Sequence, residues 1–380
     1  MAGHDGNGLG GVTLVGLPVA RRIALAAERA GFDAVGGDNG DHASVVAPGR
    51  TFAPAGRTFA PAGRTFAPRR RIVALGEHVV PQPAWLRFLL AMPLEPETLY
   101  VDGGVVAVID TEDPARVLDV AARCHGAEEL ARTLAPEVPV VRRPLEPSGR
   151  FALSGPADVP AAEAWLLRSL IKPSEGFMSR HLERRISLAV TQRLAPTRIT
   201  PNVMTIVSVG VGLCGATFFL SGTALYQTIG ALLFLAHSVL DGCDGELARL
   251  KFLESRAGAV LDFWGDNFVH VAVFACMAAG WSVATGGAWP LLLGGVTIAS
   301  ALVTAMLTAK RFIGDGGDAA ASWAGRLADA LSHRDFIYLV VALAAFGKAH
   351  WFLVLTAIGT PSFLLLLFLA GGGRRTARRP

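Results

Sequence analysis

Charged residues are scarce in this chain. Asp, Glu, Lys and Arg make up 17% of its 380 residues and apolar residues 52%, whereas an ordinary soluble domain is about 25% charged. Only four cysteines are present, far apart and without a C-x-x-C pair, which excludes a disulfide scaffold. The first residues lack a basic stretch followed by an apolar one, so we expect no cleaved signal peptide. The composition predicts an integral membrane protein.

Long apolar runs fill the second half of the chain. A helix needs about 20 apolar residues to cross a bilayer, and six segments approach that length, although the fifth is short. These segments are Val203–Gly222, Leu225–Leu240, Gly258–Val283, Trp289–Ala309, Asp335–Phe346 and Trp351–Ala370. We therefore expect an α-helical membrane domain of six transmembrane helices over residues 201–371, followed by a basic cytosolic tail at 372–380.

The basic residues between these segments indicate the orientation. Seventeen Lys and Arg residues fall on one side of the predicted membrane, and only Lys348 falls on the other. Positive residues concentrate on the cytoplasmic side of a membrane. We therefore expect a protein of the inner membrane, with both termini and the region around Asp241 on the cytosolic side. Because the basic residues alternate with apolar runs, they indicate membrane topology and not nucleic-acid binding.

Residues 1–150 have a different pattern. Short β-branched runs alternate with helical patterns, which predicts a small cytosolic α/β domain. Helices are expected at Pro18–Ala30, Pro83–Ala91 and Asp113–Leu134. Residues 151–200 are expected to form a linker and an amphipathic helix at the membrane surface.

A tandem repeat lies within the first domain. Gly-Arg-Thr-Phe-Ala-Pro occurs three times between residues 49 and 68. A proline in every repeat excludes a helical heptad, so the sequence predicts an expanded loop. Two interpretations stay open: a duplication without function, or a basic tether to the membrane surface.

Acidic and small residues follow a helical pattern around the second and third segments. One set has offsets 0, 3, 4, 7 and 8: Asp241, Asp244, Gly245, Ala248 and Arg249. A second set has offsets 0, 4 and 8: Gly258, Asp262 and Asp266. Each set falls on one face of a helix, and the short connection brings four carboxylates together. Such a cluster needs cations to offset its repulsion, and its all-oxygen ligands favour two Mg²⁺ or Mn²⁺ ions.

Three polar residues near this pattern are less informative. Glu246 and Glu254 fall outside the two faces. His270 continues the second face, where it either contacts substrate or is a hydrogen-bonded histidine of the core.

The two sets resemble the signature of the CDP-alcohol phosphotransferases (CDP-alcohol phosphatidyltransferases) at every fixed position. The pattern here is D-x-x-D-G-x-x-A-R, then eight residues, then G-x-x-x-D-x-x-x-D. The resemblance extends from about Lys172 to the end of the sequence. It implies that the four aspartates coordinate two metal ions and that Asp266 is also the general base for the acceptor hydroxyl. It implies a reaction in which an alcohol attacks the β-phosphate of a CDP-linked alcohol and releases CMP. The residues implied to hold the CDP moiety are Gly245, Ala248, Arg249 and Gly258.

The substrates are less defined. The donor is either CDP-diacylglycerol or a soluble CDP-polyol, and the acceptor is inositol phosphate, glycerol phosphate or another alcohol. Lys310, Arg311 and Arg334 flank the fourth and fifth segments, where they either bind an acceptor phosphate or serve as ordinary positive-inside anchors. The family resemblance also implies a homodimer.

The segment Lys172–Ser187 resembles the stretch that precedes the transferase domain in bifunctional inositol-1-phosphate cytidylyltransferase/di-myo-inositol-phosphate-phosphate synthases. This resemblance implies a nucleotidyltransferase-like domain in residues 1–150. The nucleotidyltransferase loop follows the first strand, whereas Gly6–Gly11 precede the strand at Val12–Val15. We therefore predict a degenerate domain without cytidylyltransferase activity.

Two other classes of protein would use intramembrane carboxylates. A transporter or channel would bind a cation with them, but it would not need Gly245, Ala248 and Arg249 at fixed offsets. A non-catalytic membrane scaffold would instead recruit a partner through the N-terminal domain.

Overall fold

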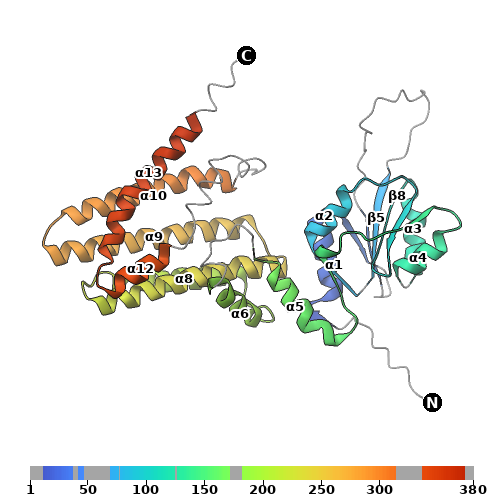
Figure 1. Ribbon diagram of the computed structural model, residues 1–380, viewed down its shortest axis with the longest axis horizontal. Coiled ribbons are helices and arrows are strands. Elements are labelled where there is room, and N and C mark those ends of the chain that lie inside the picture. Colours follow the sequence, from blue (N-terminus) through green and yellow to red (C-terminus); the bar gives the residue numbers. More distant parts are fainter. Residues whose placement is uncertain are drawn as a thin grey trace, which may run out of the picture. The chain divides into compact units, whose positions relative to one another are not determined.

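The chain divides into two compact units, Met1–Arg168 and Ser169–Pro380, which we describe one at a time. The computed structural model describes residues 12–36, 42–46, 69–76, 78–124, 126–171, 182–313 and 336–372. Within these ranges the first unit contains strands and helices and the second is helical (Figure 1). This division confirms the predicted α/β region and helical membrane region. The tandem repeat, Gly6–Gly11 and the first ten residues of the segment that starts at Lys172 lie outside the described residues.

A six-stranded sheet forms the centre of the first unit. Its order is β3-β4-β5-β8-β7-β9, and all neighbouring strands are antiparallel except β7 and β9. The strands are β3 (Asp33–Gly36), β4 (His42–Val46), β5 (Arg70–Gly76), β7 (Leu99–Asp102), β8 (Val106–Thr111) and β9 (Val140–Arg142). Two short antiparallel pairs accompany it: β1 (Thr13–Leu14) with β2 (Leu17–Pro18), and β6 (Val79–Pro81) with β10 (Arg150–Ala152).

Helices cover both faces of this sheet (Figure 1). One face carries α1 (Val19–Ala30) and α2 (Pro83–Ala91), and the other carries α3 (Pro114–Ala121) and α4 (Ala127–Leu134). Cross-strand partners such as Ile72 and Ile109 pack against α3 and α4, because residues opposite one another in a ladder point to the same face. The sequence pattern predicted a small α/β domain, and the structure has one, with helices on both faces of its sheet.

The first unit extends beyond residue 150. Helix α5 (Val159–Arg168) is held to the start of the chain by Glu163, which accepts a hydrogen bond of 2.8 Å from the Val15 backbone N–H. The Leu153 N–H donates to the His78 carbonyl at 2.7 Å. The segment up to Arg168, which we expected to be a linker, thus packs with the α/β unit.

The single helix predicted over Asp113–Leu134 is wrong, because two helices, α3 and α4, occupy that range. Gly126 lies between them with φ +149°, a conformation that excludes L-residues with a Cβ and cannot continue a helix. The Asp113 side chain caps α3 as predicted, accepting from the Arg116 N–H at 3.1 Å.

Replacement of Gly126 tests this break. Gly126→Ala is expected to destabilise the first unit by about 1 kcal/mol or more, because alanine cannot reach the native φ without strain. Gly155→Ala is the matched control, since Gly155 has φ 175° and a Cβ added there would have no atom within 4 Å. Thermal unfolding of the purified protein in detergent measures both; equal midpoints for the two variants would contradict the account.

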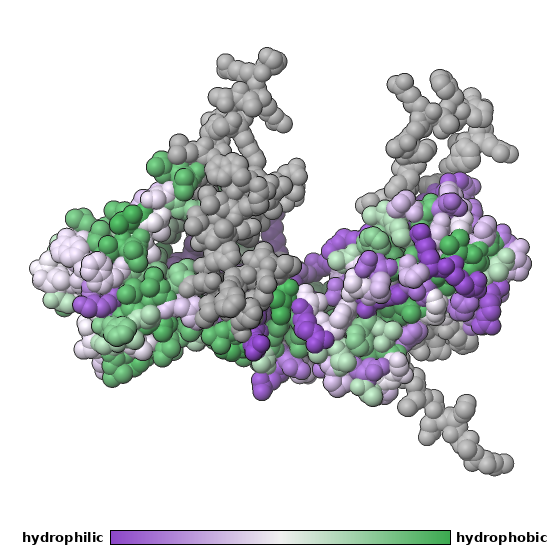
Figure 2. Space-filling view, in the orientation of Figure 1, coloured by the Kyte–Doolittle hydropathy of each residue, from purple (hydrophilic) through white to green (hydrophobic). Residues whose placement is uncertain are grey.

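The described part of the second unit is built from helices, most of them apolar. They are α6 (Arg184–Leu194), α7 (Pro201–Phe218), α8 (Ala224–Lys251), α9 (Arg256–Thr285), α10 (Trp289–Ile313), α12 (Phe336–Ala345) and α13 (His350–Gly372). Helix α8 packs against α6, α7 and α12, and α9 packs against α7 and α10. Green apolar side chains cover much of the visible surface of these helices, whereas purple polar ones are frequent on the α/β unit (Figure 2).

Four of these helices are long and apolar enough to cross a membrane: α7, α8, α9 and the part of α10 up to Ala309. Two shorter apolar helices, Phe336–Ala345 and His350–Leu366, coincide with the fifth and sixth predicted spans. The structure thus confirms an integral membrane unit, and the crossing of the last two helices stays a prediction.

Candidate metal centre and nucleotide pocket

A four-residue connection joins α8 and α9, the two helices that carry the acidic pattern. Helix α8 ends at Lys251, its C-cap residue Phe252 turns the chain with a φ of +57°, and α9 begins after Ser255. The Ser255 hydroxyl caps α9 by accepting a hydrogen bond of 3.0 Å from the Gly258 N–H. Helix α7 packs against both helices and closes the third side of the site.

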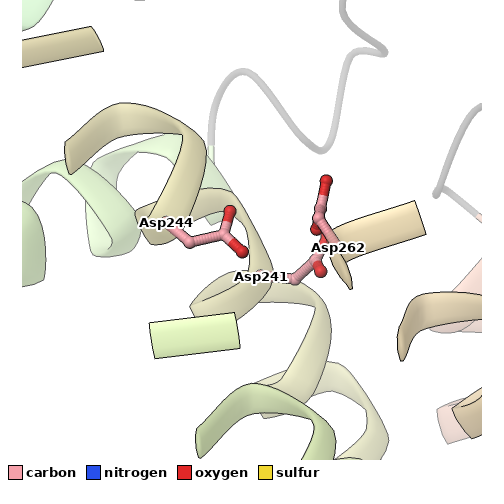
Figure 3. Close-up of side chains that lie close together, drawn as sticks. All are labelled: Asp241, Asp244 and Asp262. Carbon is pink, nitrogen blue, oxygen red and sulfur yellow. The ribbon is translucent and has the colours of Figure 1, made fainter. Parts of the chain in front are cut away.

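Three of the predicted carboxylates converge between α8 and α9. One oxygen each of Asp241, Asp244 and Asp262 lies within 4.8 Å of the others (Figure 3). Asp241 and Asp244 are 4% and 5% exposed. Carboxylates held this close out of water repel unless a cation lies between them, and an all-oxygen donor set suits Mg²⁺ or Mn²⁺. The three residues therefore fit a divalent metal ion.

Helix α7 orients one of these ligands. The Thr205 hydroxyl donates a hydrogen bond to Asp244 Oδ2, while Asp244 Oδ1 accepts from the Gly245 N–H. Thr205 is itself buried. Because both oxygens of Asp244 accept a hydrogen bond, its carboxylate is fixed in direction before any ligand arrives.

Asp266, the fourth predicted ligand, faces a histidine. Its Oδ1 lies 3.4 Å from His237 Nε2, and it is not part of the group of three. His237 is 1% exposed, and its Nδ1 donates to the Ser208 carbonyl at 2.9 Å. A methyl group at Gly212 would lie 2.9 Å from the His237 ring, so glycine is required for this approach. The candidate general base is thus held beside a buried imidazole.

His270 belongs to an aromatic cluster next to Asp266. Its Nδ1 donates to the Asp266 carbonyl at 2.8 Å, and its ring meets Phe234 edge-on at 5.3 Å. These contacts favour a hydrogen-bonded histidine of the core, the second interpretation given by the sequence.

A cavity of about 240 Å³ opens next to the carboxylates. Its wall contains all four residues predicted to hold CDP, namely Gly245, Ala248, Arg249 and Gly258, together with Asp244 and Asp262. Residues that the sequence pattern did not indicate also line it: Pro201, Asn202, Thr205, Leu253, Glu254, Ser255 and Ala259. Two of the three converging carboxylates and the predicted nucleotide residues therefore line one pocket.

Gly258 is needed at its position in this pocket. A Cβ there would lie 3.0 Å from both Asn202 Oδ1 and the Ser255 hydroxyl, closer than most real contacts. At Gly245 a Cβ would only touch the Arg249 guanidinium, at 3.5 Å. Gly258 thus makes room for neighbouring polar groups, whereas a Cβ at Gly245 would meet Arg249 only in an ordinary van der Waals contact.

An apolar groove of about 720 Å³ adjoins the pocket. Thr205 lines both, and the remainder of the groove comes from α7, α9 and α10. Its exposed side chains include Ile206, Trp264 and Phe268. The polar pocket is therefore next to an apolar groove with exposed apolar side chains.

The residues predicted for the acceptor phosphate are not described in detail. Lys310 and Arg311 belong to the last turn of α10, but their side chains lie outside the described residues, as does Arg334 altogether.

Comparison with known proteins agrees with this site. Residues 198–369 match the family model of CDP-alcohol phosphatidyltransferase. That range contains helices α7, α8, α9, α10 and α12, most of α13, and the whole acidic pattern. This part of the helical unit is thus similar to the CDP-alcohol phosphatidyltransferase family, as the sequence signature predicted.

Curated relatives share parts of the chain. It is 36% identical over 124 residues to the bifunctional IPC transferase and DIPP synthase of Thermococcus kodakarensis, a segment that covers 32% of this chain and 28% of the relative. With the protein of the same name from Aquifex aeolicus it shares 34% over 136 residues, 35% of this chain and 31% of the relative. The CDP-diacylglycerol–serine O-phosphatidyltransferase of Mycobacterium bovis is 33% identical over 96 residues, 23% of this chain and 32% of the relative. The matched segments therefore span about a third of these relatives or less.

Substitution of Asp262 tests the metal centre. Asp262→Asn removes one negative charge and one strong ligand oxygen, so Mn²⁺ affinity, measured by electron paramagnetic resonance on the detergent-solubilised protein, is expected to fall at least about tenfold. Asp119→Asn is the control, because Asp119 pairs with Arg123 on the exposed surface of the first unit. Unchanged Mn²⁺ binding by Asp262→Asn would refute the assignment.

Proposed function

We propose that the protein transfers a phosphate-linked alcohol group from a CDP-alcohol to an acceptor alcohol, with release of CMP. The observation that carries this proposal is one pocket lined by Asp244 and Asp262 of the acidic cluster and by the four predicted CDP residues. The family match of residues 198–369 supports the transferase over a transporter or a scaffold.

Four carboxylates are proposed to hold two divalent ions. Asp241, Asp244 and Asp262 supply the converging oxygens, and Asp266 lies one helical turn beyond Asp262 on the same face of α9. Bound Mg²⁺ or Mn²⁺ supplies charge stabilisation for a diphosphate and for the oxygens that attack and leave its phosphorus.

The side chains around the diphosphate have distinct roles in the proposed reaction. The Arg249 guanidinium pairs with phosphate oxygens from the pocket wall, and the open backbone at Gly258 admits the nucleotide. Asp266 accepts the proton of the acceptor hydroxyl. The alcohol oxygen then forms a bond to the β-phosphorus, the bond from that phosphorus to the bridging oxygen breaks, and CMP leaves with the bridging oxygen.

The apolar groove favours a donor with hydrocarbon chains. A polar headgroup in the 240 Å³ pocket would place its chains in the 720 Å³ groove, because Thr205 lines both. CDP-diacylglycerol has this shape, and a CDP-polyol has no part that would bury apolar surface there. The names of the curated relatives include both phosphatidyl transfer and DIPP synthesis.

The remaining features of the sequence prediction belong to this proposal. Both termini and the site face the cytosol, six helices cross the inner membrane, and two copies form a homodimer. Residues 1–150 form a degenerate nucleotidyltransferase-like domain, and Lys310, Arg311 and Arg334 bind a phosphate on the acceptor.

The direct test is CMP release by the purified protein in detergent with Mg²⁺ or Mn²⁺. CDP-diacylglycerol and CDP-inositol are offered against inositol phosphate, glycerol phosphate and serine. We expect metal-dependent CMP release that falls by about 10³-fold or more in Asp266→Asn, because the acceptor hydroxyl loses its base. CMP release that needs no metal, or that survives in Asp266→Asn, would disprove the mechanism.

A separate prediction concerns the groove. Ile206→Trp is expected to fill part of it and to raise the KM for CDP-diacylglycerol several-fold, while the KM for the acceptor stays unchanged. Leu292→Trp is the control, since Leu292 is 71% exposed on α10 and does not line the groove. Equal effects of the two variants would show that the groove does not bind the donor.

A further inference from the structure

A buried glutamate within the acidic pattern binds a neighbouring helix. Glu246 lies on α8 two residues after Asp244, outside the face that carries the metal ligands, and its exposure is 0%. Its Oε1 accepts hydrogen bonds from Arg184 Nη1 and from the Ser187 hydroxyl, both at 2.7 Å. Its Oε2 accepts from the Thr191 hydroxyl at 2.6 Å. We call these four residues the Glu246 clamp.

The three donors form one face of α6. Arg184, Ser187 and Thr191 have offsets 0, 3 and 7, so they line a single helix face that one carboxylate holds. The outer face of the same helix carries Ile186, which is 46% exposed. Helix α6 is thus fixed in rotation by polar contacts with α8, and the exposed Ile186 lies away from them.

The residues between the metal ligands Asp241 and Asp244 also pack closely against α6. A Cβ at Gly242, the residue after Asp241, would lie 3.2 Å from Arg184 Nη1 and 3.8 Å from the Ser187 Cβ. The Cys243 thiol donates to the Ser187 carbonyl at 3.5 Å. Lys251 Nζ donates to the carbonyls of Thr197 and Ile199, which extends the attachment to the end of α8. Helix α6 therefore supports α8 along the segment that bears Asp241 and Asp244.

Stability alone gives little reason for such a cluster. A buried ion pair costs so much desolvation that apolar residues of similar volume usually stabilise a protein as well or better. What a fully hydrogen-bonded carboxylate adds is a fixed direction and register, which apolar contacts specify less sharply. Here the Glu246 carboxylate fixes the register of α8, the helix that carries Asp241 and Asp244.

We infer that Glu246 is a positioning residue for the metal centre: through α6 it holds α8 in the rotation that places Asp241 and Asp244 opposite Asp262. This inference rests on the proposed function, because it presumes that these carboxylates bind a divalent ion. Glu246 itself touches neither metal nor substrate in this account.

Three substitutions separate positioning from simple electrostatics. Glu246→Gln removes a negative charge, Arg184→Gln removes a positive one, and Thr191→Val removes a hydrogen bond without changing charge. If the clamp positions the ligands, all three weaken Mn²⁺ binding, by about tenfold for the charged residues and less for Thr191. If only the local charge matters, Arg184→Gln instead tightens Mn²⁺ binding, which would overturn the inference.

The control is Glu183→Gln. Glu183 is also a buried glutamate beside α6, 4% exposed, but it accepts its hydrogen bond from the Tyr338 hydroxyl of α12 at 3.2 Å. Glutamine still accepts that bond, so Mn²⁺ affinity should stay as in the wild type.

Mn²⁺ binding is measured by electron paramagnetic resonance on the full-length protein in detergent, together with thermal unfolding and CMP release. A clamp variant that lowers the unfolding midpoint but leaves Mn²⁺ affinity unchanged would show a purely structural role and overturn the inference. Wild-type protein that binds Mn²⁺ but releases no CMP would overturn the proposed reaction alone, and the clamp would still be tested by Mn²⁺ affinity. Wild-type protein that binds no Mn²⁺ would overturn both.

Discussion

The constraint on which the helical unit depends is the repulsion among carboxylates held close together. Asp241, Asp244 and Asp262 bring their oxygens within 4.8 Å of one another, and two of them are almost fully buried. Charges in such a place are stable only with a cation between them or a proton on one of them. A chain that keeps them there must therefore hold two helices against this repulsion, and the surrounding contacts serve that purpose.

These contacts come from every side of the helix pair. The Ser255 cap starts α9 within four residues of the end of α8, Thr205 directs Asp244 from α7, and α6 holds the back of α8 through Glu246. The Thr205–Asp244 and Thr191–Glu246 hydrogen bonds are buried in an apolar bundle, where an unsatisfied polar group would be costly. These contacts hold the ligand-bearing helices to their neighbours.

The sequence predicted those parts of the site that repeat with the period of a helix. The spacing brought Asp244, Asp262, the two glycines, Ala248 and Arg249 to the wall of one pocket, because spacing determines the helix face on which a residue lies. Asp241 and Asp266 do not line that pocket, and the roles of all these residues stay predictions. The contacts of Glu246, His237 and Thr205 were missed. Their partners lie 62, 29 and 39 residues away along the chain, and no local pattern pairs such distant residues. The division of Asp113–Leu134 into two helices was missed for another reason. A glycine within a helical pattern is compatible with a continuous helix, so the sequence did not predict the φ of +149° at Gly126.

The central claim is that this pocket holds divalent metal ions against the four aspartates. Its most direct test is the anomalous scattering of Mn²⁺ in crystals of the protein grown with CDP. The account predicts anomalous peaks between α8 and α9, within ligand distance of Asp241, Asp244 and Asp262, and a second ion shared with Asp266. Ordered CDP in the pocket without any anomalous peak beside these carboxylates would contradict it.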